Sequence, residues 1–463
     1  MDTHSVLEPT PSTSAEHLRP LCAGAVHLPG DPGYDAARTP WNVAVDLRPA
    51  AVAVPRDADD VVAVVHAALD AGLRVAPMST GHAASVLGTG RLDDVVLVRL
   101  SEMTGVEVDP VSRTARVVGG TLWQDVVEAA APHGLAALHG SSPDVAVAGY
   151  CLGGGIGWYA RKHGFAANSI RAVDLVTPTG ELLRLDADQH ADLFWAVRGG
   201  SGNFGIVTAL EIALLPIPDA YAGMLLWDAA SAPQVVRAWA AWAPGAPEEV
   251  TTSCRVMRFP PLPELPDFLR GRQVVIIDGA VLASDDEASR ILAPLRALAP
   301  EMDTFTRMPA AALPRIHMDP EGGAPAAADH TMLAELPEEA VEVFLAAVAA
   351  GPSLLAAELR QLGGALARRT PGGGAIGATD AAFAGFFLGI APTPEAADAV
   401  RRDAARAVAA LEPWAAGREL PTFAEHRDGT RRCYDGADWE RLVALRGQVD
   451  PGRRMVAGLP IEG

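Results

Sequence analysis

Hydrophobic positions recur with helical spacing in residues 57–72, close to the start of a long, regularly patterned region. Asp57 or Asp59 stands where a helix N-cap is preferred, and Gly72 stands where a left-handed residue would end the helix. One face of this predicted helix carries Val61, Val62, Val65, Ala68 and Leu69. An amphipathic helix is therefore expected here.

Short apolar runs follow this helix and predict buried strands at residues 73–77, 94–100 and 114–120. Thr121 and Gln124 have the spacing of a capping box, which predicts that the next helix covers residues 122–133. Because strand and helix signals alternate to about residue 180, the N-terminal region is predicted to have α/β layers.

The pattern changes after residues 214–219, where alanine-rich helices separate the apolar strands. Helices are predicted at 286–299 and 337–350, and strands at 251–259, 273–283, 356–367 and 383–391. Such a pattern is typical of α+β domains, in which helices cover one face of an antiparallel sheet. A short helix within residues 440–463 is expected to return to the first domain.

Length and charge restrict the possible classes of protein. A chain of 463 residues is too long for one hydrophobic core, so at least two domains are expected. The formal net charge of −20 and the sequence pI near 5.0 argue against nucleic-acid binding. No apolar run reaches the length of about 18 residues that a membrane span needs, and residues 1–20 show no apolar secretory segment.

Cysteine usage argues against disulfide and metal sites. The four cysteines, Cys22, Cys151, Cys254 and Cys433, are scattered without paired spacing. We therefore expect no structural zinc and no disulfide framework, and we expect the protein in the reducing cytoplasm.

Three glycine-bearing segments stand out, because glycine destabilises a fold unless the backbone needs its freedom. The first, residues 74–84, places Gly81 and His82 side by side in a loop. The second, residues 139–164, contains Gly149, Gly153, Gly154, Gly155 and Gly157. Such turns present backbone N–H groups to a pyrophosphate, although a bend that packs a strand against a helix is the simpler alternative. The third, residues 192–214, contains Gly199, Gly200, Gly202 and Gly205.

Taken together, these segments resemble the berberine bridge enzyme-like flavoproteins of the vanillyl-alcohol oxidase superfamily. The stretches AGYCLGGGIGWYARKHGFAAN (148–168) and DLFWAVRGGSGNFGIVT (192–208) are similar to two long motifs of that family. PGDPGYDAARTPWN (29–42) and Asp450–Pro451 agree with it as well. The likeness is strong over residues 20–220 and continues, more weakly, to the end of the chain.

The resemblance implies an α+β protein with a PCMH-type FAD-binding domain made of two α/β subdomains. This domain is expected over residues 20–216. A substrate domain with an antiparallel sheet covered by helices is expected over residues 217–416. Residues 417–463 are expected to return to the FAD-binding domain.

FAD is the cofactor that the resemblance implies, and His82 is expected to bond covalently to the 8-methyl carbon of the flavin. A histidine that is merely packed or solvated is the alternative. Met78 and Thr80 replace an arginine and a glycine of the family's loop. Ser142 stands where many relatives have a second linking cysteine, so a single link is expected. The remaining residues expected to bind FAD are Ser79, Gly81, Val145, Gly149, Gly153, Gly154, Gly155, Gly157, Gly205, Ile206 and Val207, together with Thr80 and Ser142 themselves.

The strand 356–368 is similar to the segment in which relatives place a polar catalytic residue. Period-two alternation puts Glu358 and Arg360 on one face, with Leu359 and Gln361 on the other. We expect Glu358 to act as a base beside the Arg360 guanidinium while hydride leaves to the flavin. The alternative is an ion pair on the solvent side of the sheet. Residues expected in the substrate pocket are Trp158, Tyr159 and Gln361, with simple packing as the alternative for Trp158.

Two further segments bear on the mechanism. His317 and Asp319 lie in a loop that either covers the site or forms a plain turn. Residues 420–423, LPTF, replace a tyrosine- and asparagine-bearing strand of the family, so the resemblance supplies no tyrosinate base here.

The expected function is that of an FAD-dependent oxidoreductase that removes hydride from a C–H bond of a small alcohol, sugar or secondary metabolite. The resemblance implies that Val145 stands beside the flavin's oxygen-reactive carbon, where among relatives valine accompanies oxidases and a bulkier aliphatic residue accompanies dehydrogenases. An oxidase that passes electrons to O2 is therefore favoured. The alternatives are a dehydrogenase with another acceptor, a flavin-bearing protein without turnover, and an aldonolactone-type role. The expected partners are a small-molecule substrate and O2, not nucleic acid or a membrane, while substrate identity and oligomeric state stay open.

Overall fold

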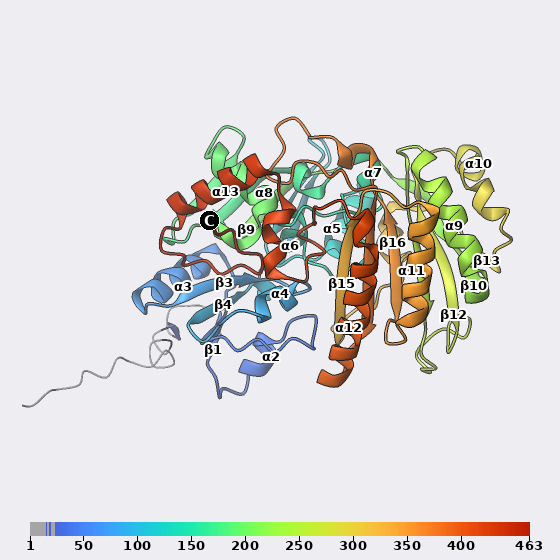
Figure 1. Ribbon diagram of the computed structural model, residues 1–463. Coiled ribbons are helices and arrows are strands. Elements are labelled where there is room, and N and C mark those ends of the chain that lie inside the picture. The colour runs from blue at the N-terminus through green and yellow to red at the C-terminus, as the bar shows by residue number, and fades with distance from the viewer. Residues whose placement is uncertain (1–14, 16–17, 20–23) are drawn as a thin grey trace, which may run out of the picture.

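The computed structural model describes residue 15, residues 18–19 and residues 24–463. The prediction for residues 1–20 therefore falls largely outside the described residues, as does Cys22. Within the described part of the chain, the strands form three separate sheets, and helices pack between and against them (Figure 1). The predicted α+β class is confirmed.

The first sheet has four strands in the order β1-β2-β4-β3. Strands β2, β4 and β3 are parallel, and β1 pairs antiparallel with β2. The predicted helix is α3 (Ala58–Asp70), which Asp57 caps at its start and which Gly72 follows with a φ of +69°. The strands of this sheet are β1 (Ala25–His27), β2 (Ala51–Val54), β3 (Arg74–Met78) and β4 (Val95–Arg99), and the short helices beside it are α2 (Tyr34–Arg38) and α4 (Ala84–Gly88).

The second sheet has five strands in the order β5-β6-β9-β7-β8, all paired antiparallel. Helix α3 packs against β7 and β9, so it lies between the first two sheets. The strands are β5 (Val106–Asp109), β6 (Thr114–Val118), β7 (Ile170–Val176), β8 (Leu182–Asp186) and β9 (Ile206–Ala213), and the helices are α5 (Trp123–Ala130), α6 (Val147–Leu152), α7 (Ala160–His163) and α8 (Ala191–Gly200).

The predicted capping box at Thr121 and Gln124 is wrong. The Thr121 hydroxyl instead exchanges hydrogen bonds with the backbone of Gly105, at 3.0 and 3.1 Å. Helix α5 begins at Trp123, and the Asp125 carboxylate accepts a hydrogen bond from the backbone N–H of Leu122. A tertiary contact has therefore displaced a locally favourable cap.

The third sheet has eight antiparallel strands, seven of them in the order β13-β10-β12-β11-β16-β17-β15, with β14 paired to β10. Helices α9–α12 cover one of its faces (Figure 1). The strands are β10 (Asp219–Asp228), β11 (Val250–Arg258), β12 (Gln273–Val281), β13 (Met302–Asp303), β14 (Thr306–Pro309), β15 (Ala326–Leu333), β16 (Ala356–Gln361) and β17 (Phe383–Ile390), and the helices are α9 (Ala232–Trp242), α10 (Asp285–Arg296), α11 (Glu338–Ala350) and α12 (Pro394–Leu411).

Strand β16 ends at Gln361, which is six residues earlier than predicted. Gly363 and Gly364 follow with φ values of +80° and +58°, a backbone conformation that no strand can continue. A short 3-10 turn, Gly364–Ala367, takes the place of the expected end of the strand. The strands β10, β13, β14 and β15 were not predicted from the sequence.

The C-terminal helix α13 (Gly436–Val449) packs against α8, and Met455 pairs with Val75 at the edge of the first sheet. Buried Arg446 stabilises the packing of the C-terminal segment on the first half of the chain. It donates hydrogen bonds to Asn203 and to the backbone oxygens of Ile461 and Met455. The domain limits 20–216, 217–416 and 417–463 remain predictions.

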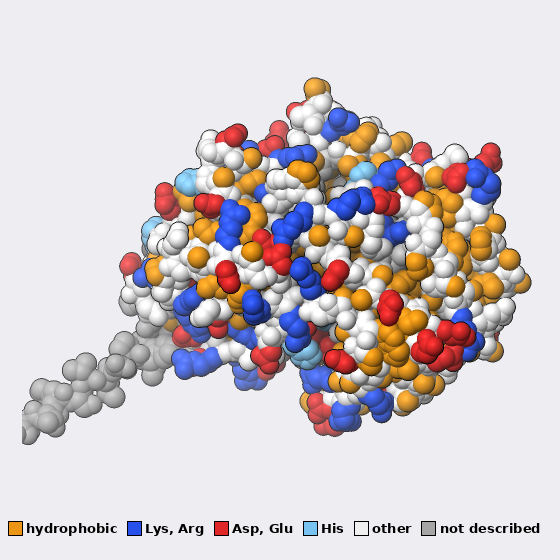
Figure 2. Space-filling view, turned by 45° about the horizontal axis from the view of Figure 1, so that its top comes forward, with side chains coloured by type: hydrophobic (Ala, Val, Ile, Leu, Met, Phe, Trp, Pro, Cys, Tyr) orange, Lys and Arg blue, Asp and Glu red, His pale blue; other side chains and the backbone are white. Residues whose placement is uncertain are grey.

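The surface carries charges of both signs. On the face in Figure 2, Arg and Lys side chains lie among Asp and Glu side chains. Among the described helices, none has both the length and the apolar character needed to cross a membrane.

A single buried arginine joins the glycine-rich region to the eight-stranded sheet. Arg161 on α7 donates from Nε to the oxygen of Leu362 at 2.8 Å, and from its terminal nitrogens to the oxygens of Pro247, Val250 and Ala246 at 3.0, 2.5 and 3.1 Å. One guanidinium therefore donates to four backbone carbonyls of the sheet region.

We expect Arg161→Met to lower the free energy of unfolding by about 3 kcal/mol, because it removes the side-chain donor from the carbonyls of the buried residues Leu362, Val250 and Ala246. The matched control is Lys162→Met on the same helix, whose side chain forms only a partly exposed pair with Glu249 at 3.4 Å. That control should change the free energy by less than about 1 kcal/mol. Urea unfolding followed by circular dichroism measures both values, and equal effects would contradict the proposed role of Arg161.

Candidate functional site

The loop after β3 holds His82 against an indole ring. The side chain of His82 is 25% exposed, and the ring of Trp41 stacks on it with centroids 4.3 Å apart. Thr80 Oγ1 lies 2.9 Å from His82 Nδ1, and the backbone N–H of Trp41 donates to the oxygen of Thr80. Gly81 has a φ of +83°, and a Cβ there would lie 2.6 Å from Pro40. The loop therefore needs glycine at that position, and the imidazole is held rather than free in solvent.

Asp144 faces the other ring nitrogen of His82, with Oδ1 3.6 Å from Nε2. Its Oδ2 accepts hydrogen bonds from Trp41 Nε1 at 2.7 Å and from the backbone N–H of Gly322 at 2.8 Å. Its Oδ1 also accepts from Ser142 Oγ at 2.8 Å. Burial acts to raise the pKa of Asp144, but these donors and His82 outweigh burial and hold the pKa well below its usual range. Asp144 is therefore a stable carboxylate beside the imidazole.

The glycines of the second segment have different structural roles. Gly154 and Gly155 are consecutive left-handed residues, with φ values of +103° and +71°. A Cβ at Gly157 would lie 1.8 Å from the oxygen of His139, so that glycine is required by packing within the protein. At Gly149 a Cβ would meet no described atom within 4 Å. The segment thus combines a tight internal bend with one open backbone position.

The other residues expected to bind FAD mainly contact other parts of the protein. Gly153 approaches Thr422, and a Cβ at Gly205 would lie 2.4 Å from the oxygen of Val176. Ser79 Oγ donates to the oxygen of Gly119 at 3.0 Å. Val145 is half-buried. Ile206 and Val207 are buried in β9 and pack into two different cores.

Several buried polar atoms near the glycine-rich segment have no hydrogen-bond partner among the described residues. They include the hydroxyls of Tyr150 and Tyr159 and Nε2 of His82. Tyr150 contacts Gly140 and Gly155, the ring of Tyr159 lies 5.3 Å from that of His139, and burial raises the pKa of both phenols. Unpaired donors beside an open glycine fit a large ligand with many hydrogen-bond acceptors, such as FAD.

A buried cluster of charges lies on the face of the eight-stranded sheet opposite the helices. Ser253 pairs with Asp278 and with Arg360 across the sheet, and Arg255 pairs with Glu358. The register therefore brings these five side chains onto one face. Leu359, Cys254 and Ile277 alternate with them and pack against the helices. The charged face is directed at the glycine-rich half of the protein, because the core of the five-stranded sheet continues onto it.

His317 completes the cluster from the loop before β15. Its Nδ1 lies 2.9 Å from Asp278 Oδ2, and its Nε2 lies 3.6 Å from Glu358 Oε2. Arg360 Nε donates to Glu358 Oε1 at 2.7 Å, and Arg255 donates to Asp278. The exposed fractions of His317, Asp278 and Glu358 are 4%, 0% and 5%, so water screens these contacts little.

The opposite charges in the cluster determine which of its side chains are protonated. Burial and Arg255 act to lower the pKa of His317, but Asp278, Asp319 and Glu358 raise it to about 9. Burial acts to raise the pKa of Glu358, yet Arg360 and His317 hold it well below its ordinary value. At neutral pH the cluster therefore contains a charged imidazolium and ionised carboxylates.

The structure decides between several alternatives for these residues. Glu358 and Arg360 do share a face, and it is a buried face rather than a solvent-side one. His317 does lie in a turn, but its side chain is buried in the cluster rather than exposed to solvent. Asp319 is half-exposed and accepts a hydrogen bond from Ser141 Oγ at 2.9 Å.

Gln361 requires a correction, because it does not lie with the predicted pocket residues. It belongs to the helix-covered face, where Nε2 donates to the oxygen of Ala243 and Oε1 accepts from Thr252 Oγ1. Trp158 is 2% exposed; its Nε1 donates to the oxygen of Leu313, and its ring lies 5.6 Å from that of His317. Trp158 therefore packs directly on the cluster.

The sequence does not predict Asp278 and Arg255 as site residues. The available signal was an ionisable residue in the middle of each of two apolar strands, QVVIIDGAV (273–281) and VTTSCRVMR (250–258). A charge in a central strand survives burial only when it is paired, so each one indicates a partner nearby.

The segment 420–423 does lie between the glycine-rich region and the charged face. The guanidinium of Arg360 is 5.5 Å from the centre of the Phe423 ring, and Phe423 packs edge-on against Phe386 at 5.7 Å. Thr422 lies against Gly153. This chain therefore supplies an aromatic ring without a hydroxyl beside Arg360.

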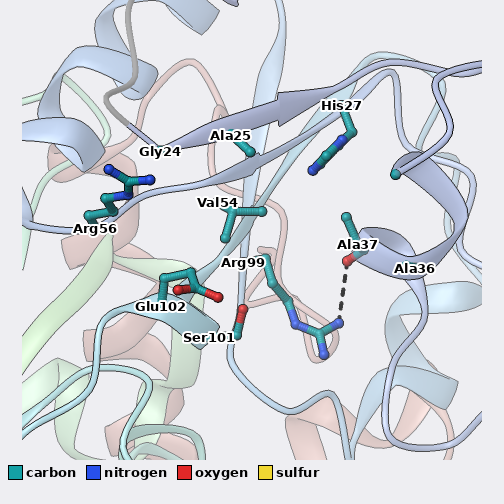
Figure 3. A pocket seen from close by; sticks show the side chains of 11 residues that line it. Gly24, Ala25, His27, Ala36, Ala37, Val54, Arg56, Arg99, Ser101 and Glu102 are labelled. Carbon is teal, nitrogen blue, oxygen red and sulfur yellow. Dashed lines mark hydrogen bonds between the residues drawn. The ribbon is translucent and has the colours of Figure 1, made fainter.

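A separate pocket of about 400 Å³ opens where β2 and β4 end (Figure 3). Arg56, Arg99 and Glu102 line it, with His27 on the opposite wall. Arg99 already donates hydrogen bonds to the oxygens of Ala37 and Thr39. None of the predicted site residues lines this pocket. Within the described residues, no group of His, Cys, Asp and Glu has the arrangement of a metal site.

Comparison with known proteins is consistent with a flavin site. Residues 49–186 match the family model described as FAD binding domain. The chain is 37% identical over 205 residues to (R)-6-hydroxynicotine oxidase of Paenarthrobacter nicotinovorans, covering 44% of each chain. It is 34% identical over 194 residues to glucooligosaccharide oxidase of Sarocladium strictum, covering 42% of this chain and 39% of the relative. The chain thus spans less than half the length of these curated relatives.

The fold is similar over the whole chain to that of a berberine bridge enzyme-like protein from Physcomitrella patens, BBE-like 1. The TM-score is 0.84 at 19% sequence identity, and the match covers 97% of this chain and 99% of the other. At that identity the likeness establishes the fold alone.

The raised pKa of His317 predicts a pH-dependent stability. Because the folded pKa, about 9, exceeds the unfolded value of about 6.5, the stabilisation is fully present below pH 6.5 and is lost as the pH rises through 9. The free energy of unfolding should fall by on the order of 2–3 kcal/mol across this window, and His317→Gln should lack the fall. His133→Gln, at an exposed histidine, is the control. Urea unfolding at successive pH values tests this, and parallel curves for His317→Gln and the unaltered protein would contradict it.

Proposed function

We propose that this chain, a flavoprotein of the berberine bridge enzyme-like type with an FAD binding domain, is an FAD-dependent oxidase of small molecules. The substrate class is a small alcohol, sugar or secondary metabolite from which a hydride is removed at a C–H bond. O2 takes the electrons and hydrogen peroxide is released. The names of the two curated relatives, one a nicotine derivative oxidase and the other an oligosaccharide oxidase, support this class.

The observation that carries the proposal is the buried cluster of Glu358, Arg360, His317 and Asp278 on the sheet face directed at the glycine-rich segment. Bound FAD would supply the hydride acceptor and the route to O2. The cluster supplies what the flavin lacks, namely fixed charges that orient a polar substrate and receive its proton.

Glu358 is suited to accept the proton that the substrate loses. Its lowered pKa makes it a weak base toward an ordinary alcohol. However, an alcohol from which hydride is leaving becomes a protonated carbonyl, which is a far stronger acid than any carboxylic acid. Transfer to Glu358 is therefore favourable as the C–H bond breaks, although not before. This timing ties proton transfer to hydride transfer.

Arg360 and His317 hold the carboxylate of Glu358 in place, and Asp278 holds the imidazole of His317 through Nδ1. With its pKa near 9, His317 stays cationic at neutral pH and acts as a positioning group rather than a base. Trp158 packs on the imidazole and closes this side of the cluster to water.

For the cofactor, we propose one covalent link, through His82. Ser142, at the position where a cysteine would make a second link, is engaged with Asp144 instead. Unpartnered phenols and an open glycine at position 149 leave hydrogen-bond donors and backbone space for FAD, which supports this proposal. Three described cysteines, Cys151, Cys254 and Cys433, are free and buried, which supports the proposed location in the cytoplasm.

Purified protein should be yellow, should keep its colour in the pellet after acid precipitation, and should release hydrogen peroxide with at least one member of an alcohol, sugar and amine screen. A colourless protein that does not take up FAD would refute the proposal. A flavin that substrate bleaches but air reoxidises slowly would favour the dehydrogenase alternative. Absence of bleaching across the screen would favour a flavin-bearing protein without turnover.

Glu358→Gln should slow flavin reduction by about 100-fold, because the amide cannot accept the proton. Anaerobic stopped-flow bleaching measures this rate directly. Glu248→Gln, at an exposed pair with Arg368, is the matched control and should leave the rate unchanged. An unaltered reduction rate in Glu358→Gln would remove the residue from the mechanism.

The choice of acceptor can be tested at Val145, which the resemblance places beside the oxygen-reactive carbon of the flavin. Val145→Leu should slow reoxidation of the reduced flavin by O2 at least about 10-fold, because a bulkier side chain blocks the approach of O2. The rate of reduction by substrate should change little. Double-mixing stopped flow separates the two rates, and equal reoxidation in both proteins would contradict the role of Val145.

A further inference from the structure

The guanidinium of Arg360 keeps one of its edges free of hydrogen bonds. Its Nε donates to Glu358 Oε1 at 2.7 Å, but neither terminal nitrogen, Nη1 or Nη2, has an acceptor among the described residues. The side chain is 12% exposed, so it is not sealed in the core. Arg161, by contrast, directs Nε and both terminal nitrogens at backbone carbonyls. Two adjacent N–H donors without an acceptor match the two oxygens of a carboxylate.

The charges of the buried cluster leave room for a further anion. Three cations, Arg255, Arg360 and His317, face two buried carboxylates, Asp278 and Glu358. His317 counts as a cation at neutral pH because its pKa is raised to about 9. The buried part of the cluster therefore carries one positive charge in excess.

The groups at the rim of the cluster compete little for the free edge of Arg360. Asp319 lies with Oδ1 3.9 Å from His317 Nε2, but its side chain is 32% exposed, and it already accepts a hydrogen bond from Ser141. Water therefore screens its charge. On the side of segment 420–423, the ring of Phe423 lies 5.5 Å from the guanidinium and brings no charge.

We propose that the substrate of this chain is a hydroxy acid whose carboxylate binds the free edge of Arg360. This inference rests on the proposed oxidase function and narrows its substrate class. A guanidinium is a small planar group, so a carboxylate on its free edge lies close to Glu358 at Nε. The hydroxyl that gives its proton to Glu358 must then be close to the carboxylate, as it is in a 2-hydroxy acid.

The reaction of such a substrate balances. The carbinol carbon loses its hydrogen with both bonding electrons, which bound FAD accepts, and the hydroxyl loses its proton to Glu358. The C–O single bond becomes a carbonyl, so the product is an oxo acid. O2 takes the two electrons together with two protons and becomes hydrogen peroxide. Arg360 changes no bond in this reaction, because its role is to fix the carboxylate relative to Glu358.

Binding can be tested without turnover by isothermal titration calorimetry of the purified protein. Acetate, butyrate and benzoate are each compared with the corresponding amide, which has a similar shape but no charge. At least one carboxylate should bind about 10-fold or more tightly than its amide, because it accepts two charge-assisted hydrogen bonds. Arg360→Met should abolish this preference, and Arg360→Lys, which keeps the charge but not the paired donors, should retain part of it.

The matched control is Arg368→Met, at an exposed pair with Glu248, which should leave the preference unchanged. Equal affinity of carboxylates and amides for the unaltered protein overturns the inference, and this comparison holds even if Arg360→Met does not fold. A preference that persists in Arg360→Met overturns it as well.

Anaerobic bleaching of the flavin tests the substrate class itself. Glycolate, lactate and mandelate are compared with their amides, and for at least one pair the acid should reduce the flavin about 100-fold more efficiently. Arg360→Lys should raise KM for that acid more than it lowers kcat. Bleaching by neutral alcohols or sugars, without any preference for carboxylates, overturns the inference but leaves the oxidase intact. Carboxylate binding that depends on Arg360, without bleaching by any compound, contradicts the oxidase instead and leaves the anion site.

Discussion

The inner face of the eight-stranded sheet is shaped by a requirement for charge balance. Asp278 and Glu358 are buried there as ionised groups, and moving such ions out of water costs several kcal/mol each. The structure meets this cost with Arg255, Arg360 and the imidazolium of His317, each in contact with a carboxylate. Removal of any one of these cations would leave at least one buried carboxylate with a single cationic partner, so the geometry of the face is tightly constrained.

The same requirement determines how the two halves of the protein meet. His317 must reach Asp278 from a loop outside the sheet, which draws that loop onto the charged face. Farther along the loop, Asp319 accepts from Ser141 and the backbone of Gly322 donates to Asp144. The loop is thus anchored to the sheet at one end and to the glycine-rich segment at the other. This double attachment fixes the distance between the glycine-rich segment and the cluster.

Sequence patterns predicted the elements whose side chains alternate cleanly. Helix α3, strands β11, β12 and β17 and the shared face of Glu358 and Arg360 follow from period and capping alone. Strand β15 was missed because its sequence, AAADHTML, contains polar residues that only a tertiary partner explains. The prediction that Gln361 lines the pocket is wrong, because the alternation puts it on the opposite face from Glu358, where it accepts a hydrogen bond from Thr252.

The sequence alone did not predict which charged side chains are buried. His317 looks like a turn residue in RIHMDPEGG, and nothing local shows that Asp278, nearly forty residues earlier, lies against its Nδ1. A charged residue inside an apolar strand does indicate that a residue of opposite charge lies nearby. Which residue that is depends on the strand register, which exists only in the assembled sheet. Asp144 illustrates the same limit: its neighbour Trp41 lies 103 residues before it in the chain, and its neighbour Gly322 lies 178 residues after it. Because one loop contributes both the imidazolium of the cluster and a donor to Asp144, the surroundings of His82 are complete only when the sheet is in place.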